Sequence, residues 1–128
     1  MIGVDTNVLV RVVVDDDQAE DQCHKARMLL SSQKKIFVSQ VVLIECVWVI
    51  QRAYSVGKNK TVSVLNALLS HPGVSLEGRL LVRKALQLYE ENNVDFSDAL
   101  IWTANSEKGS LLYTFDRKLA RIEGMESL

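Results

Sequence analysis

The sequence predicts an α/β fold in which a parallel sheet is covered by helices on both faces. Short apolar segments with strand character alternate with segments of helical periodicity along the 128 residues, and no linker interrupts them. Acidic residues end or interrupt four of the apolar segments. We therefore expect a single domain, residues 1–128. Because ligands of such sheets bind beyond the carboxyl ends of the strands, we expect its site at that edge of the sheet.

Two strands and four helices are expected in the first half of the chain. They cover residues 2–4, 8–14, 17–32, 36–39, 40–54 and 60–70. The first strand delivers Asp5 at its carboxyl end. Asp17 and Glu20 have the spacing of a capping box for the third segment, and Ser39 can cap the apolar helix that follows it. A turn at residues 55–59 makes the last two helices a hairpin.

Two strands and two helices are expected in the second half. They cover residues 74–76, 79–91, a helix from Asp95 or Ser97 to about Lys108, and residues 111–115. Pro72 and Gly73 separate the first of these strands from the preceding helix, and Gly109 suits a helix C-terminal cap.

The composition allows a substantial core but no general attraction to nucleic acid. Hydrophobic residues make up 48% of the chain, and the net charge is -1, so any contact with nucleic acid must be local. The chain has no basic-then-apolar leader and no apolar run of membrane-spanning length, so we expect a cytoplasmic protein. Cys23 and Cys46 form no CxxC pair, and we expect two reduced thiols.

Four acids at the ends or interruptions of apolar segments are the candidate site. Carboxylates are rarely buried alone, so four in one small domain suggest a shared cation, for which a hard divalent metal is suited. Taken singly, Asp5 could be a helix cap and Asp116 an ordinary turn aspartate, and only the set favours a site. The set is Asp5, Glu45, Asp98 and Asp116.

Two of these acids have structural alternatives that the sequence leaves open. Glu45 lies in the middle of a helix, where capping cannot explain it, but it could pair with Arg52 two turns later. Asp95 and Asp98 have the D-x-x-D spacing of a capping pair. We assign capping mainly to Asp95 and metal binding mainly to Asp98.

Four motifs, in this order, resemble those of the PIN-domain ribonucleases, especially the VapC-type toxins of prokaryotic toxin–antitoxin pairs. They are Asp5-Thr6-Asn7-Val8-Leu9, the segment 39–45, Asp95-Phe96-Ser97-Asp98-Ala99 and Thr114-Phe115-Asp116. The resemblance implies a three-layer PIN-like fold with a central parallel sheet of about five strands. Residues 125–128 are a short and weak candidate for the fifth strand. It also implies a Mg2+- or Mn2+-dependent endoribonuclease, a homodimer, and an antitoxin that occupies the active-site groove.

Carried onto this sequence, the resemblance makes Asp5, Glu45, Asp98 and Asp116 the catalytic and metal-binding set. Thr114 would hold the carboxylate of Asp116 through a hydroxyl hydrogen bond. Further supporting positions are Asn7 and Asp95.

The expected chemistry is hydrolysis by a metal-activated water that leaves a 5'-phosphate and a 3'-hydroxyl. Neither His24 nor His71 lies in a motif, which argues against a two-histidine mechanism. Three cations follow the last acid at helix-like spacing and could hold backbone phosphates, or could be a solvated helix face. These are Arg117, Lys118 and Arg121. Nothing in the sequence distinguishes tRNA, rRNA or mRNA as the substrate.

Apolar residues beyond the needs of the core point to a dimer or partner surface. They lie in residues 8–14 and 41–50. We expect Trp48 and Trp102 to be core or dimer contacts rather than surfaces on which bases stack. Two other functions compete with the nuclease. One is a PIN-like scaffold that binds RNA or protein without cutting. The other is a phosphoacceptor receiver domain, which would need an acceptor aspartate after a mid-chain strand, where residues 51–57 have none.

Overall fold

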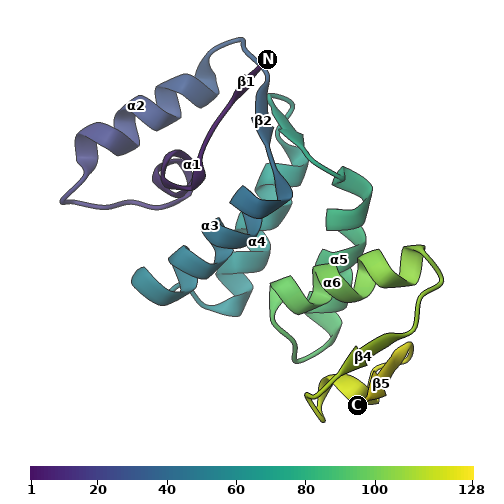
Figure 1. The fold of residues 1–128 in the computed structure, drawn as a ribbon. Helices are drawn as coiled ribbons and strands as arrows, with labels where there is room; N and C mark the ends of the chain where they lie inside the picture. The colour runs from purple at the N-terminus through teal and green to yellow at the C-terminus, as the bar shows by residue number, and fades with distance from the viewer. The chain divides into compact units, whose positions relative to one another are not determined.

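Three short parallel strands form the sheet of the first unit, Met1–Arg79, in a computed structural model that describes residues 1–128 (Figure 1). The elements of this unit are β1 (Ile2–Gly3), α1 (Thr6–Val13), α2 (Glu20–Ser31), β2 (Ile36–Val38), α3 (Gln40–Ala53), α4 (Lys58–Ser70) and β3 (Val74–Leu76). The strand order is β1-β2-β3, and Ile36 of the central strand is in register with Ile2 and Val74. The predicted parallel arrangement of these strands is therefore confirmed.

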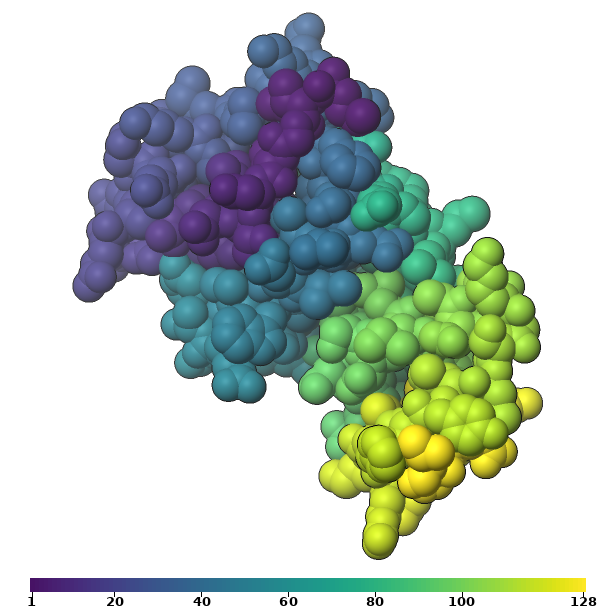
Figure 2. Space-filling view, viewed as in Figure 1, coloured from purple at the N-terminus to yellow at the C-terminus, as the bar shows by residue number.

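Apolar residues at helical spacing bury one face of each helix against this sheet or against a neighbouring helix. Helix α1 lies between α2 and α3, as the purple segment of Figure 2 shows. Its Leu9 and Val10 are buried, as are Leu43 and Ile50 of α3. Val38 is only 1% exposed, as expected for a central strand covered on both faces.

The long helix α3 begins as the sequence predicts, whereas α2 does not. Ser39 caps α3, since its hydroxyl accepts a hydrogen bond from the Val42 N–H at 3.2 Å. Helix α2 begins at Glu20 with no side-chain cap, so the predicted capping box with Asp17 is wrong. The preceding loop is organised by Asp16 instead, whose carboxylate accepts hydrogen bonds from the Gln18 N–H at 2.9 Å and the Tyr54 hydroxyl at 2.7 Å.

The second unit, Leu80–Leu128, contains two helices followed by a small parallel sheet. Its elements are α5 (Arg79–Glu91), which starts at the last residue of the first unit, α6 (Phe96–Glu107), β4 (Leu112–Thr114), the 3-10 helix η1 (Leu119–Arg121) and β5 (Met125–Ser127). The rings of Tyr89 and Phe96 pack edge to face at 5.8 Å, which joins the end of α5 to the start of α6. Gly109, with φ at 67°, ends α6 as predicted.

The five strands are divided between two sheets, which corrects the expectation of one central sheet of about five. Strands β4 and β5 pair with each other in parallel, with Leu112 opposite Met125. Residues 125–127, within the segment that was a candidate for a fifth strand, do form a strand, and Met125 is buried. The α/β class itself is confirmed.

The remaining general features concern the helices and the thiols. None of the helices combines the length and apolar character needed to cross a membrane. Both cysteines are free and buried, and burial raises the pKa of the Cys46 thiol to about 12. Cys46 is therefore a protonated core residue rather than a nucleophile.

Candidate functional site

Asp5 lies just beyond β1 and caps helix α1. Its Oδ1 accepts a hydrogen bond from the Val8 N–H at 3.0 Å, and its backbone oxygen accepts one from the Leu9 N–H at 3.1 Å. The side chain is exposed, and its Oδ2 accepts no hydrogen bond. Capping therefore uses one oxygen of Asp5 and leaves the other available for a ligand.

Glu45 is held beside the N-terminus of α1 by the residue that follows Asp5. The Thr6 hydroxyl donates a hydrogen bond to Oε1 of Glu45 at 3.1 Å, across 39 residues of sequence. The alternative ion pair with Arg52 is not formed, because the Arg52 guanidinium lies over the ring of Trp48. Asp5 and Glu45 thus both lie at the N-terminus of α1.

Thr6 is a partner of the candidate site that the sequence did not identify. It follows Asp5 directly, and nothing in its own spacing indicates a partner in α3. Only the packing of α1 against α3 brings its hydroxyl to Glu45. The nearby Asn7, predicted as a supporting residue, is exposed and lines a groove of about 550 Å³ beside Asp5.

Asp98 lies in the first turn of α6 in the second unit and is half-buried. Burial raises the pKa of its carboxyl, and the neighbouring carboxylates of Asp95 and Asp116 raise it further. No lysine or arginine forms an ion pair with Asp98. Asp98 is therefore close enough to Asp95 and to Asp116 to be repelled by each of them, without a compensating side-chain cation.

Asp95 occupies the N-cap position of α6 but does not cap it with its side chain. The backbone oxygen of Asp95 accepts a hydrogen bond from the Ala99 N–H at 3.0 Å, while its carboxylate makes no capping hydrogen bond. The assignment of Asp95 to capping is therefore wrong for the side chain. The carboxylate is exposed beside Asp98 instead.

Asp116 follows β4 and organises the turn into η1. Its Oδ1 accepts hydrogen bonds from the N–H groups of Lys118 at 2.8 Å and Leu119 at 3.2 Å. Contrary to the expectation, the Thr114 hydroxyl does not hold the Asp116 carboxylate. Its oxygen accepts a hydrogen bond from the backbone N–H of Asp116 at 3.0 Å. Thr114 therefore fixes the backbone of Asp116, and the turn fixes the carboxylate.

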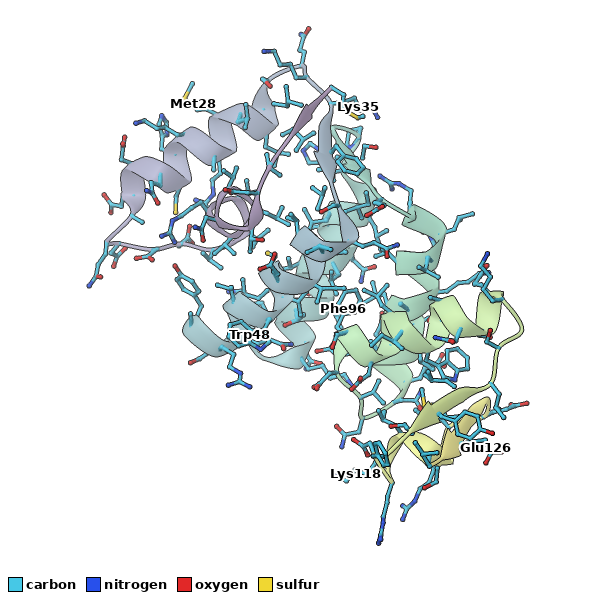
Figure 3. The ribbon with its side chains drawn as sticks, viewed as in Figure 1. Met28, Lys35, Trp48, Phe96, Lys118 and Glu126 are labelled. Atoms are coloured by element: carbon cyan, nitrogen blue, oxygen red, sulfur yellow. The ribbon has the colours of Figure 1, made fainter.

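Three exposed cations accompany this turn, although not on an α-helix. The segment that follows Asp116 is a turn and the short η1, so the predicted helical spacing is wrong; Figure 3 labels Lys118 on this segment. None of the three forms an ion pair. They are Arg117, Lys118 and Arg121.

The structure gathers the predicted acids within each unit. Glu45 lies beside the segment that carries Asp5, and Asp98 lies within electrostatic reach of Asp95 and Asp116. No three His, Cys, Asp or Glu side chains are arranged as a metal-ligand group. The convergence of all four acids into one site therefore stays a prediction.

Comparison with known proteins gives one family and one structural neighbour. The family model of the PIN domain matches residues 2–125. Among solved structures, VapC20 of Mycobacterium tuberculosis, described as a sarcin-ricin loop cleaving toxin, is similar at 20% sequence identity, covering 94% of this chain and 93% of that one with a TM-score of 0.46. The comparison with curated proteins gives no match.

Proposed function

This chain belongs to the PIN domain family, and from that premise we propose that it is a metal-dependent endoribonuclease. The observation that carries the proposal is the state of Asp98, whose pKa is raised by burial and by the carboxylates of Asp95 and Asp116. Ionised carboxylates held together without a cationic side chain are costly to maintain unless a cation binds among them. Perturbed acids of this kind are typical of functional sites.

The donor set suits a hard divalent cation. All four proposed ligands are carboxylates, and Mg2+ or Mn2+ prefers such oxygens to nitrogen or sulfur. When bound, such an ion would lower the pKa of a water molecule and offset the negative charge of the phosphate. We propose Asp5, Asp98 and Asp116 as direct ligands, with Glu45 either a ligand or the group that orients the attacking water.

The hydrogen bonds of these acids support that division of roles. Asp5 and Asp116 each engage one carboxylate oxygen with backbone N–H groups, which fixes the side chain and leaves the second oxygen for the ion. Thr6 fixes one oxygen of Glu45, so the other can accept a proton from water. Arg117, Lys118 and Arg121 would bind RNA phosphates beside Asp116.

We extend the proposal to the biology implied by the sequence motifs. The chain would act as one domain, as a homodimer and in the cytoplasm, and would be the toxin of a type II toxin–antitoxin pair. A cognate antitoxin would then occupy the active site. The RNA substrate would be a tRNA, an rRNA or an mRNA.

The direct test is RNA cleavage by the purified protein. We expect cleavage with Mg2+ or Mn2+, none in EDTA, and fragments with 5'-phosphate ends in mass spectrometry. Cyclic 2',3'-phosphate ends, or full activity in EDTA, would contradict metal-dependent hydrolysis. Binding of RNA without cleavage under any divalent ion would favour the non-catalytic scaffold.

A further inference from the structure

The outer face of α3 carries a solvent-exposed tryptophan and arginine close to Glu45. Trp48, labelled in Figure 3, is 58% exposed, so it does not lie in the core, which was one of the two places expected for it. The Arg52 guanidinium lies 5.1 Å from the centroid of the Trp48 ring. Glu45, Trp48 and Arg52 occur at helical spacing of three and four residues, so they share one stripe of the helix.

This pair has the chemistry of a base-binding surface. A tryptophan ring offers a large stacking face, and a guanidinium adds a planar cation that stacks on bases or pairs with phosphate. Arg52 has no acidic partner, so its charge is not used within the protein. The stacked arrangement already holds both side chains in place, which lowers the entropy that binding would cost.

The distance from Glu45 suits a nucleotide next to the cut. At about 1.5 Å of rise per residue, Trp48 lies about 4.5 Å and Arg52 about 10.5 Å along the helix axis from Glu45. A base stacked on Trp48 would therefore be a near neighbour of a phosphate held at the acidic site.

We propose that Trp48 and Arg52 bind an unpaired base and its phosphate beside the cleaved bond. This inference rests on the proposed function, because Glu45 is what places the surface next to the reaction. A base inside a duplex is already stacked and cannot lie on Trp48, so paired RNA would gain nothing from this surface.

A second copy of the chain fits this surface less well than an RNA base does. A stable interface buries about 800 Å² on each partner, whereas one tryptophan contributes about 150–250 Å². On this face of α3 the charged side chains of Glu45 and Arg52 separate the apolar residues. The other large exposed apolar residue of the helix, Val41, lies two turns from Trp48. The single ring of Trp48 and the single charge of Arg52 are instead enough to bind one base and one phosphate.

The test measures RNA binding in EDTA, so it does not depend on cleavage. Fluorescence anisotropy of a labelled single-stranded RNA should show at least about tenfold weaker binding for Trp48→Ala and a smaller loss for Trp48→Phe. Arg52→Ala should reduce the slope of log affinity against log salt concentration by about 1, the value expected for the loss of one phosphate contact. The matched controls, Val41→Ala on the same helix and Arg83→Ala on α5, should bind like wild type, and no variant should change the affinity for a fully paired RNA.

Tryptophan fluorescence provides a second readout that does not require a destabilising variant. Single-stranded RNA should quench wild-type emission but not that of Trp48→Phe, in which only Trp102 remains. Light scattering on the same samples tests the competing occupant. Loss of a dimer in Trp48→Ala, with quenching absent in wild type, would overturn the inference in favour of a second copy.

The outcomes also separate this inference from the proposed function. Metal-dependent cleavage with unchanged RNA affinity in both Trp48 variants would overturn the inference and leave the nuclease intact. RNA binding that depends on Trp48, without cleavage in Mn2+, would support the inference and contradict the nuclease.

Discussion

Replacing Asp98 by asparagine should stabilise the metal-free protein. In EDTA at pH 7 the carboxylates of Asp95 and Asp116 face that of Asp98, and burial adds to the cost of ionising it. The neutral amide removes this repulsion but keeps the shape. Because Asp98 is only half-buried, solvent screens the repulsion, and we expect a gain of about 0.2–1 kcal/mol in the free energy of unfolding. The melting temperature should rise by no more than about 5 °C.

The pH dependence gives the same prediction an independent check. A carboxyl whose pKa is raised on folding binds its proton more tightly in the folded state, so its contribution to stability is complete below the ordinary value of 3.8. That contribution is lost as the pH rises through the raised pKa of the folded state. Wild type should therefore lose stability relative to Asp98→Asn as the pH rises from 3.8 towards 7, and the two should converge in acid.

The assay is thermal unfolding with and without Mn2+, with Asp17→Asn as the control. Asp17 is an exposed aspartate that makes no ion pair, so its substitution should change neither the stability nor the response to the metal. Wild type should gain about 2.7 kcal/mol at a Mn2+ concentration of 100 times its Kd, and Asp98→Asn clearly less. Equal stabilisation of both proteins by Mn2+ would show that Asp98 is not a metal ligand, and a loss of stability in Asp98→Asn in EDTA would contradict repulsion among these carboxylates.

Two further predictions concern the first unit. Thr6→Val removes the hydrogen bond to Glu45 and should lower kcat about 5- to 10-fold with little change in KM. Thr6→Ser keeps the hydroxyl and should retain most of the wild-type rate. Equal rates in the valine and serine variants would show that the hydrogen bond is only structural. Induced expression in a bacterium without the antitoxin should arrest growth, and Asp5→Asn should relieve the arrest at equal protein level. This variant should keep its fold, because asparagine also caps helices. Growth arrest by Asp5→Asn as strong as by wild type would count against catalysis as the cause of the arrest.

The sequence predicted the helices and strands well where local chemistry determines them. Ser39 has the hydroxyl that caps α3, and Gly109 adopts the positive φ that ends α6, so both boundaries follow from single residues. The start of α2 did not follow from Asp17 and Glu20, because Asp16 forms hydrogen bonds to the loop backbone and to Tyr54, which lies 38 residues away. Contacts of that range leave no periodic signal in the sequence.

In the candidate site, too, the sequence identified the residues with a local signal but not their distant partners. The acids were identified because a carboxylate at the end of an apolar segment is chemically unusual. Their partners were not, since the Thr6 hydroxyl reaches Glu45 only through helix packing, and Thr114 turned out to hold the backbone of Asp116. The division of five strands between two sheets also depends on pairing between distant segments, which apolar patterns alone do not specify.

Titration of the metal-free protein with Mn2+ tests most directly whether the acids of both units form one site. We expect saturable binding that is weakened at least about tenfold by Asp5→Asn and equally clearly by Asp98→Asn, with the double variant little worse than either. Asp17→Asn should bind Mn2+ as wild type does. Mn2+ binding that survives unchanged in either Asp5→Asn or Asp98→Asn would contradict a shared metal site.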